Sequence, residues 1–274
     1  MSASDPVIVT GANGQVGRRI LRAWSRKPPS FSVAAVARST GPDWQEWLVG
    51  AAPIVPRARA IVGLWGVCFG TLEETRANLT LAQEAQQLGA QTGADRVIHL
   101  STQSVYGRNC NQATERQTPT PVNSYGQAKA EMESYLRSAE GPRPIILRVA
   151  NVIGADAISR ALAGTSKVTL DRFADGKGPL RSFVGIADLA DLIACAITCP
   201  LDTCPDVINV AAQTPLHMEE ILKAANRPFE WRDAPENALR VATVSTDMLL
   251  QTALPTPKAA TAAALYQDWK DHAD

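Results

Sequence analysis

A tyrosine and a lysine four residues apart, Tyr125 and Lys129, lie in the segment SYGQAK. Residues at this spacing share one face of a helix, so the ammonium of Lys129 can approach the phenol of Tyr125. A nearby positive charge favours the phenolate, which predicts that the pKa of Tyr125 falls from about 10 toward neutrality. Tyr125 could then act as a general acid or base. Taken alone, the pair is equally typical of an ordinary, partly exposed helix face.

Hydroxyl side chains cluster shortly before this pair, in the segment LSTQSVYG at residues 100–107. The cluster follows an apolar run that is typical of a β-strand. Open parallel sheets bind ligands beyond the carboxyl ends of their strands. A hydroxyl at this place could donate a hydrogen bond to a reacting oxygen.

Three glycines at intervals of three, Gly11, Gly14 and Gly17, occupy the segment VTGANGQVG. Between a strand and a helix, such a turn lets the backbone approach a pyrophosphate, whose charge the helix N-terminus stabilises. The spacing G-x-x-G-x-x-G differs from the G-x-G-x-x-G of the dinucleotide-binding fingerprint. The flanking strand and helix nevertheless favour a dinucleotide-binding turn.

The elements that would position these residues alternate along the first half of the chain. Val16, Ile20 and Trp24 recur at helical spacing after the glycine turn. Helices are also expected over 78–88 and 124–136, and strands over 6–10, 31–37, 61–67, 96–100 and 145–149. Residues 40–60 show no convincing strand and helix. Beyond residue 150 the pattern loosens, until a helix is expected over 186–199 and a strand over 207–210.

This alternation predicts an α/β fold, a doubly wound parallel sheet (Rossmann fold) with a smaller C-terminal substrate-binding part. The dinucleotide-binding domain is expected over residues 1–150. The substrate-binding part is expected mostly over 151–274, interleaved with the sheet through the helix and the strand that follow residue 186.

Composition excludes several classes of function. Lysine plus arginine and aspartate plus glutamate both total 27 of 274 residues, so no basic surplus attracts nucleic acid or anionic lipid. The chain shows neither a signal-peptide pattern nor an apolar run near the roughly 20 residues that span a bilayer. We therefore expect a soluble, cytoplasmic protein that acts on a small molecule.

Five cysteines, an odd number, argue against a disulfide framework, and we expect reduced thiols. Cys195, Cys199 and Cys204 lie close together in the sequence, but none of the three histidines has ligand spacing to them. We expect buried structural cysteines and no metal site.

Taken in order, these segments resemble the extended short-chain dehydrogenase/reductase family, which includes nucleotide-sugar epimerases and dehydratases. TGANGQVG is similar to its cofactor turn, STQSVYG to its serine/threonine motif, and SYGQAK to its catalytic tyrosine and lysine. The resemblance continues through NLTLAQEAQQLG from Asn78, LRVANVIG at 147–154, GPLRSFVGIADLADLI at 178–193 and VINVAA at 207–212.

The resemblance implies a role for individual positions. Thr102 would supply the catalytic hydroxyl, Tyr125 the acid/base, and Lys129 the charge that lowers the tyrosine pKa and binds the nicotinamide ribose. The cofactor-binding positions it implies are Gly11, Asn13, Gly14, Gln15, Val16, Gly17, Arg38, Ser39, Leu64, Trp65, Asn78, Tyr125 and Lys129. The substrate-binding positions it implies are Thr102, Gln103, Ser104, Asn151 and Arg181. For Asn151 and Arg181, a turn asparagine and a surface arginine are the ordinary alternatives.

Three departures from the family pattern bear on function. Arg38 ends the second strand where NAD-binding members carry an acidic residue, which favours NADP over NAD because arginine suits a 2′-phosphate. A solvated strand-end charge is the alternative. Trp65 replaces a small residue, so it would crowd or shape the cofactor site. Gln103 and Ser104 stand where dehydratases carry Asp-Glu, which disfavours dehydration.

The predicted activity is that of an NAD(P)-dependent epimerase or oxidoreductase acting on a hydroxyl or ketone of a nucleotide sugar. Two alternatives remain: an NADPH-dependent reductase of a non-sugar carbonyl compound, and a non-catalytic dinucleotide-binding redox sensor. The intact set of Thr102, Tyr125 and Lys129 favours an enzyme. Many relatives dimerise through two helices from each subunit, so the resemblance also allows a homodimer.

Overall fold

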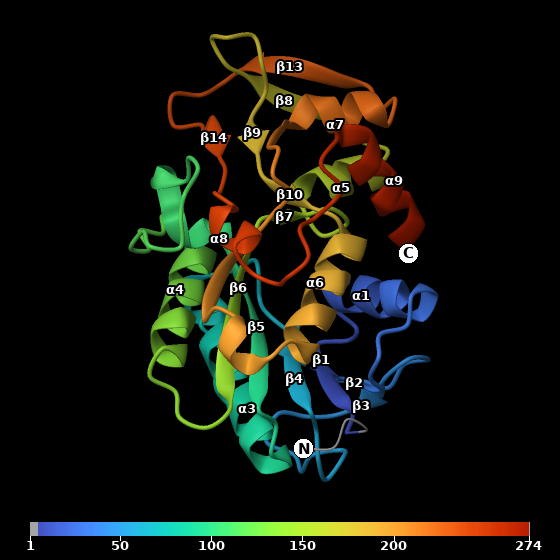
Figure 1. Ribbon diagram of the computed structural model, residues 1–274. Coiled ribbons are helices and arrows are strands. Elements are labelled where there is room, and N and C mark those ends of the chain that lie inside the picture. The colour runs from blue at the N-terminus through green and yellow to red at the C-terminus, as the bar shows by residue number, and fades with distance from the viewer. Residues whose placement is uncertain (1–4, 274) are drawn as a thin grey trace.

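Seven parallel strands form the central sheet of the protein, in a computed structural model that describes residues 5–273 (Figure 1). Their order across the sheet is β11-β6-β5-β4-β1-β2-β3. Their bounds are β1 Val7–Thr10, β2 Val33–Ala37, β3 Gln45–Glu46, β4 Ala60–Gly63, β5 Arg96–Thr102, β6 Arg143–Val149 and β11 Val207–Val210. The order reverses between β1 and β4, which is where ligands bind in doubly wound sheets.

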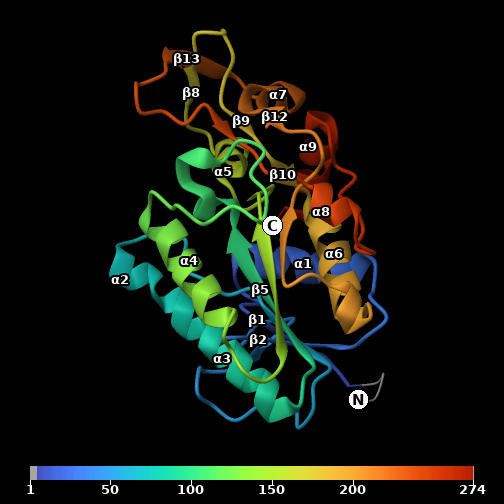
Figure 2. The same ribbon diagram turned by 60° about the vertical axis from the view of Figure 1, so that its left-hand side comes forward.

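Helices cover both faces of this sheet (Figure 2). On one face lie α1 (Gln15–Arg26) and α6 (Ile186–Thr198), and on the other α2 (Leu72–Thr75), α3 (Ala77–Thr92) and α4 (Ser124–Leu136). Strand residues alternate between the two layers: Val7 and Val9 pack with the α1 and α6 side, and Ile8 packs with the α3 side. Because both faces are covered, the central strands are mainly apolar, although β5 and β6 also carry buried polar residues.

A smaller part of the chain lies above the carboxyl ends of the strands (Figure 1). Its helices are α5 (Ala157–Ala163), α7 (Met218–Ala224), α8 (Asp247–Leu250) and α9 (Ala262–His272). Its strands are β7 Asn151–Val152, β8 Val168–Arg172, β9 Leu180–Arg181, β10 Phe183–Val184, β12 Leu216–His217, β13 Phe229–Asp233 and β14 Val241–Ala242. They pair as β10-β7, β12-β9-β14 and β13-β8. Short 3₁₀ turns cover Gln103–Asn109 and Leu201–Thr203.

Most elements lie where the sequence predicts them, and the helix expected over 124–136 has those bounds. The strand expected over 61–67 instead spans Ala60–Gly63, and its last ladder bond runs from the backbone N–H of Leu64 to the carbonyl oxygen of Thr10 (3.1 Å). The second strand starts at Val33 rather than residue 31, since Phe31 packs edge-on against Trp24. Residues 40–60, where no strand was expected, contain the two-residue edge strand β3.

The cysteines agree only in part with the expectation that they are buried. Cys199 and Cys204 are buried, as expected for structural thiols, whereas Cys195 is only half-buried. Among the helices of residues 5–273, none combines the length and the apolar character needed to cross a membrane.

Candidate active site

The turn between β1 and α1 brings backbone atoms closer together than any side chain would allow. A Cβ atom on Gly17 would lie 2.2 Å from the carbonyl oxygen of Gly11, and one on Gly11 would lie 2.4 Å from the backbone nitrogen of Trp65. Gly11 also has φ +73°, which favours glycine. Gly14 is the N-cap of α1 and supplies no side-chain cap, so the first N–H groups of the helix remain available to an anion. This cradle fits a pyrophosphate, and Asn13, Gln15 and Val16 lie on it.

Trp65 stands directly beside this turn. Its ring lies 5.8 Å from that of Trp47, tilted by 32°, and Trp47 itself is buried next to β3. The sequence raised the prospect that Trp65 shapes the cofactor site, and the structure places it against the backbone of Gly11. Trp47 was missed, because residues 40–60 carry no periodic pattern.

Arg38 and Ser39 are exposed immediately beyond the carboxyl end of β2. The adjacent glycine turn is tied to the same strand, since the backbone N–H of Ala12 donates to the carbonyl oxygen of Val36 (3.1 Å). Trp44 donates to the carbonyl oxygen of Ser39 (3.0 Å) and so orders the residues that follow. Arg38 is therefore next to the turn and open to solvent.

Thr102, Tyr125 and Lys129 come together at the carboxyl end of β5. The hydroxyl of Thr102 lies near enough to the phenol of Tyr125 to lower the pKa of that phenol. Lys129, buried on the next turn of α4, has its ammonium 6.0 Å from the centre of the Tyr125 ring and donates to the carbonyl oxygen of Leu100 (2.7 Å). Thr102 also accepts a hydrogen bond from the backbone N–H of Ser104 (3.2 Å). The structure therefore brings together the three residues to which the family resemblance assigns the chemistry.

Gly126 lets α4 approach closely enough for this cluster to form. A Cβ atom there would lie 2.6 Å from the carbonyl oxygen of Ser104. Asn123 starts the helix, because its side-chain oxygen accepts the N–H of Gly126 (2.7 Å). Neither role was predicted from the sequence, although an asparagine just before an expected helix is an N-cap signal.

The pKa of Tyr125 is raised, not lowered as the Tyr-Lys spacing predicted. Burial is the main cause, because it disfavours the phenolate, and a hydrogen bond to Cys68 adds to the effect while the one to Thr102 opposes it. The prediction was wrong because burial dominates the pKa of the phenol, while the ammonium of Lys129 donates to the backbone of β5 instead. Burial also lowers the pKa of Lys129 to about 8, against the charges of Cys68 and Glu133.

Cys68 is a site residue that the sequence did not indicate. It is exposed in the loop between β4 and α2, yet its thiol reaches the Tyr125 side chain. Asn78 holds this loop in place: its amide donates to the carbonyl oxygens of Val67 (2.9 Å) and Thr75 (2.7 Å), and its side-chain oxygen accepts the N–H of Val67 (3.2 Å). Asn78 would therefore affect cofactor binding indirectly, by fixing the loop that carries Cys68.

Three of the predicted substrate-binding residues differ in how far their polar groups are satisfied. Gln103 is buried, and its side-chain oxygen has no hydrogen-bond partner among the residues that the structure describes. Asn151 donates to the carbonyl oxygen of Ser182 (2.9 Å). Arg181 donates to the carbonyl oxygens of residues 180, 239 and 240, and burial lowers its pKa to about 10. Asn151 therefore lies in strand β7 rather than in a turn, and Arg181 is half-buried rather than on the surface.

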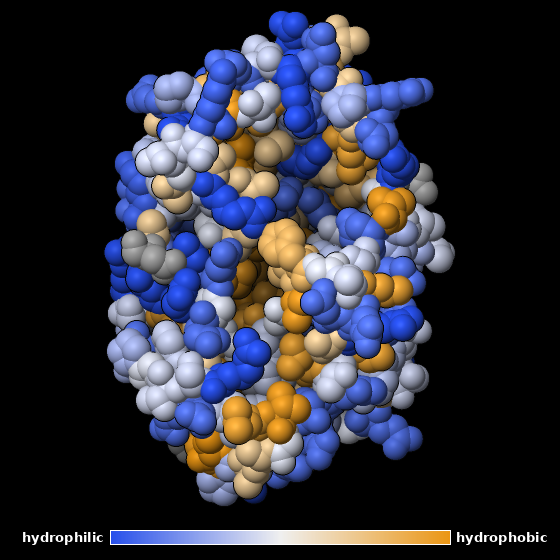
Figure 3. All heavy atoms as spheres, turned by 180° about the vertical axis from the view of Figure 1, so that it is seen from behind, coloured by the Kyte–Doolittle hydropathy of each residue, from blue (hydrophilic) through white to orange (hydrophobic). Residues whose placement is uncertain are grey.

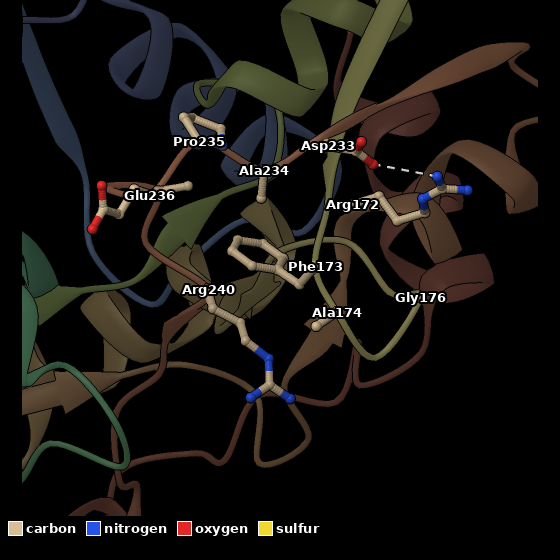
Figure 4. Close-up of a pocket in the computed structure, with 10 residues that line it drawn as sticks. Arg172, Phe173, Ala174, Gly176, Asp233, Ala234, Pro235, Glu236 and Arg240 are labelled. Atoms are coloured by element: carbon tan, nitrogen blue, oxygen red, sulfur yellow. Dashed lines mark hydrogen bonds and ion pairs between the residues drawn. The ribbon is translucent and has the colours of Figure 1, made fainter.

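A cavity of about 780 Å³ opens in the smaller part of the protein (Figure 4). The side chain of Phe173 points into it, and the pair Arg172 and Asp233 (3.3 Å) lies at one side. Arg240 also lines it, and the backbone of Arg240 accepts a hydrogen bond from Arg181. The surface seen from behind is also hollowed near its middle, where apolar residues are visible at the floor (Figure 3).

Comparison with known proteins agrees with this geometry. Residues 7–211 match the model of the NAD dependent epimerase/dehydratase family. The dTDP-6-deoxy-L-talose 4-dehydrogenase (NAD(P)(+)) of Kitasatospora kifunensis is 28% identical over 191 residues, 63% of this chain and 59% of that protein. The UDP-glucose 4-epimerase of Azospirillum brasilense is 31% identical over 193 residues, 61% of this chain and 55% of that protein. The matches thus span less than two thirds of the length of either relative.

Solved structures show the same fold over nearly the whole chain. The UDP-N-acetylglucosamine 4-epimerase of Methanobrevibacter ruminantium, in complex with UDP-N-acetylmuramic acid, superimposes with a TM-score of 0.79 at 18% identity, covering 97% of this chain and 98% of that one. MoeE5, in complex with UDP-glucuronic acid and NAD, gives a TM-score of 0.78 at 20% identity, covering 97% and 99%. With the family model matching residues 7–211, the chain belongs to the NAD-dependent epimerase/dehydratase family.

Proposed function

We propose that the protein is an NAD(P)-dependent epimerase or oxidoreductase acting on a hydroxyl or ketone of a nucleotide sugar. The observation that carries this proposal is the cluster of Thr102, Tyr125 and Lys129 at the carboxyl end of β5. Both curated relatives are named for reactions at position 4 of a nucleotide-linked sugar. The cluster lies at the edge of the sheet where such folds bind their ligands.

The residues of the glycine turn fit a nicotinamide dinucleotide. Gly11 and Gly17 leave a cradle that a Cβ atom would fill, at the uncapped N-terminus of α1. A bound cofactor would exchange the hydride of the reaction. Lys129 would bind its ribose, and the exposed guanidinium of Arg38 would bind a 2′-phosphate, so we propose a preference for NADP.

Tyr125 is suited to donate a proton to the substrate oxygen. Its raised pKa keeps the phenol protonated at neutral pH, and Thr102 can hold the same oxygen in place. In the opposite direction, the phenol would have to release its proton first, which requires the charge of Lys129 to act on it. The protonated phenol therefore supports reduction of a ketone more directly than oxidation of a hydroxyl.

The cavity around Phe173 supports a nucleotide as part of the substrate. The planar ring of Phe173 offers a stacking contact to a base. Arg172 and Arg240 would contact phosphates only by leaving their present partners, Asp233 (3.3 Å) and Asp175 (2.5 Å). Arg181 donates a hydrogen bond to the backbone carbonyl oxygen of Arg240, which lines this cavity. Gln103, in turn, could accept a hydrogen bond from a sugar hydroxyl, because its buried oxygen lacks a partner among the described residues.

The test begins with the nucleotide content of freshly purified protein, followed by NADPH consumption with a 4-keto nucleotide sugar. Bound NAD without net consumption identifies an epimerase, and protein that oxidises NADPH identifies a reductase. Activity only with carbonyl compounds that lack a nucleotide would replace the proposed substrate class. Failure to bind any nicotinamide nucleotide would contradict the proposal as a whole, while binding without any turnover would favour a redox sensor.

A further inference from the structure

A buried ion pair lies beneath the proposed catalytic residues. Glu133 and Arg148 are 1% and 0% exposed, and their side chains are 2.6 Å apart. Glu133 is on α4, one turn beyond Lys129 and two turns beyond Tyr125, so all three lie along one side of the helix. Arg148 is on β6, in the middle of the sheet.

The carboxylate of Glu133 joins three elements of the site. One oxygen accepts hydrogen bonds from the hydroxyl of Ser101 (2.6 Å) and from Nε of Arg148 (3.0 Å). The other accepts Nη2 of Arg148 (2.6 Å). Because Ser101 immediately precedes Thr102 on β5, this carboxylate connects the helix of Tyr125 with the strand of Thr102.

Arg148 is held in turn by groups that follow β5 in the chain. It donates to the hydroxyl of Tyr106 (2.9 Å) and to the carbonyl oxygen of Glu115 (3.3 Å). Tyr106 donates to the side chain of Asn209 on β11 (2.7 Å). A buried ion pair is costly to desolvate, and an apolar pair of similar volume is often as stable. Stability alone therefore does not account for this network, whereas a geometric role does.

We propose that Glu133 is a positioning residue: its carboxylate, held by Arg148 and Ser101, fixes the helix of Tyr125 and Lys129 against the strand of Thr102, and places a negative charge one turn from Lys129. The inference rests on the proposed function, because it concerns the placement of the groups that would perform that reaction. Arg148 and Ser101 serve by holding Glu133, and none of the three needs to touch the substrate.

The charges around Lys129 predict a distinctive effect on its titration. On its own helix it faces Tyr125 and Glu133, on β5 it faces His99, and in the loop after β4 it faces Cys68. Burial lowers the pKa of His99 to about 3, so this ring is neutral at physiological pH. The groups that face Glu133 are Arg148, Ser101 and Arg137. Arg76, between α2 and α3, is paired with Glu131 instead. Neutralising Glu133 removes a charge that raises the pKa of Lys129.

Replacing Glu133 by Gln keeps the volume and removes the charge. We expect Glu133→Gln to lower turnover about 10- to 100-fold through misplacement of the reacting groups, with NADPH binding retained. The decline of activity at alkaline pH should move down by about one pH unit, because Lys129 then loses its proton more easily. Glu131→Gln, on the same helix but at the surface, is the matched control and should leave turnover and the pH profile unchanged.

A second variant guards against loss of folding. Glu133→Leu combined with Arg148→Met replaces the ion pair by apolar side chains, so it should fold and show the same fall in turnover. Titration of ¹⁵Nζ-labelled lysine, with Lys129→Arg to assign the signal, reports the pKa of Lys129 without turnover. Wild-type turnover and an unmoved profile in Glu133→Gln would overturn the inference. If the wild-type protein is inactive with all nucleotide sugars, the result counts against the proposed function. The titration of Lys129 then tests the present inference by itself: equal midpoints in the wild type and in Glu133→Gln would overturn it.

Discussion

The ammonium of Lys129 is 2.7 Å from the carbonyl oxygen of Leu100, so its hydrogen bond goes to the backbone of β5 rather than to the phenol of Tyr125. Burial raises the pKa of that phenol and lowers the pKa of Lys129 to about 8. The phenol of Tyr125 is therefore protonated at neutral pH, and Lys129 is the group whose charge changes just above it.

Replacing Tyr125 by Phe should remove the proton donor while keeping the ring that faces Lys129. We expect turnover to fall by a factor of about 100 or more, with little change in cofactor affinity. Steady-state rates and a fluorescence titration with NADPH measure the two quantities. Turnover equal to that of the wild type would exclude Tyr125 as the acid.

Activity should decline as the pH rises through about 8, the pKa of Lys129. Its pKa is lower than the ordinary value for lysine, so the ammonium is present below this pH and is lost above it. Arginine stays charged in proteins, so whatever activity Lys129→Arg retains should show no decline near this pH. A decline of the same shape in both proteins would assign it to another group.

Arg38→Ala should weaken NADPH binding about 10- to 100-fold and leave NADH binding almost unchanged, because only NADPH carries the 2′-phosphate. Arg26→Ala, an exposed arginine at the far end of α1, serves as the control for loss of general positive charge. Isothermal titration with both cofactors measures the effect. Equal losses for the two cofactors would show that Arg38 acts on the fold or on the adenosine.

Gly17→Ala and Gly14→Ala should form a graded pair. The new Cβ would lie 2.2 Å from the carbonyl oxygen of Gly11 in the first variant and 3.1 Å from it in the second. The first must shift α1 and should lower the free energy of unfolding by about 1–3 kcal/mol, with a loss of cofactor affinity. The second should be milder in both respects. Thermal unfolding and cofactor titration compare them, and the reverse order would refute the close approach seen here.

Periodicity predicted the central sheet, and the strand-end position of Thr102, read with the family resemblance, predicted that it would meet Tyr125 and Lys129. Both follow from local patterns, since parallel strands deliver their carboxyl ends to one edge. The raised pKa of Tyr125 was not predictable, because it depends on burial and on Cys68, which approaches from a distant loop. Trp47 and β3 were missed for a related reason: their segment has no period, and only contact with Trp65 and β2 gives them an ordered place.

The smaller part of the protein was also poorly predicted from sequence. Strands β8 and β13 pair in parallel although residues 168–172 and 229–233 are far apart in the chain. Many of its other strands contain only two residues, too few to show alternation. The buried pair of Glu133 and Arg148 likewise requires knowledge of which strand lies under α4.

The position of β11 has a consequence for synthesis on the ribosome. This strand is the outermost partner of β6, with Val207 opposite Ile146 and Val210 opposite Val149. It is nevertheless translated only after the segment from β7 to β10 and the helix α6 have been made. Until it emerges, β6 is an unprotected edge whose free N–H and C=O groups can pair with another nascent chain. The sheet is therefore closed late, and slow translation before residue 207 would lengthen the interval in which the growing protein is prone to aggregate.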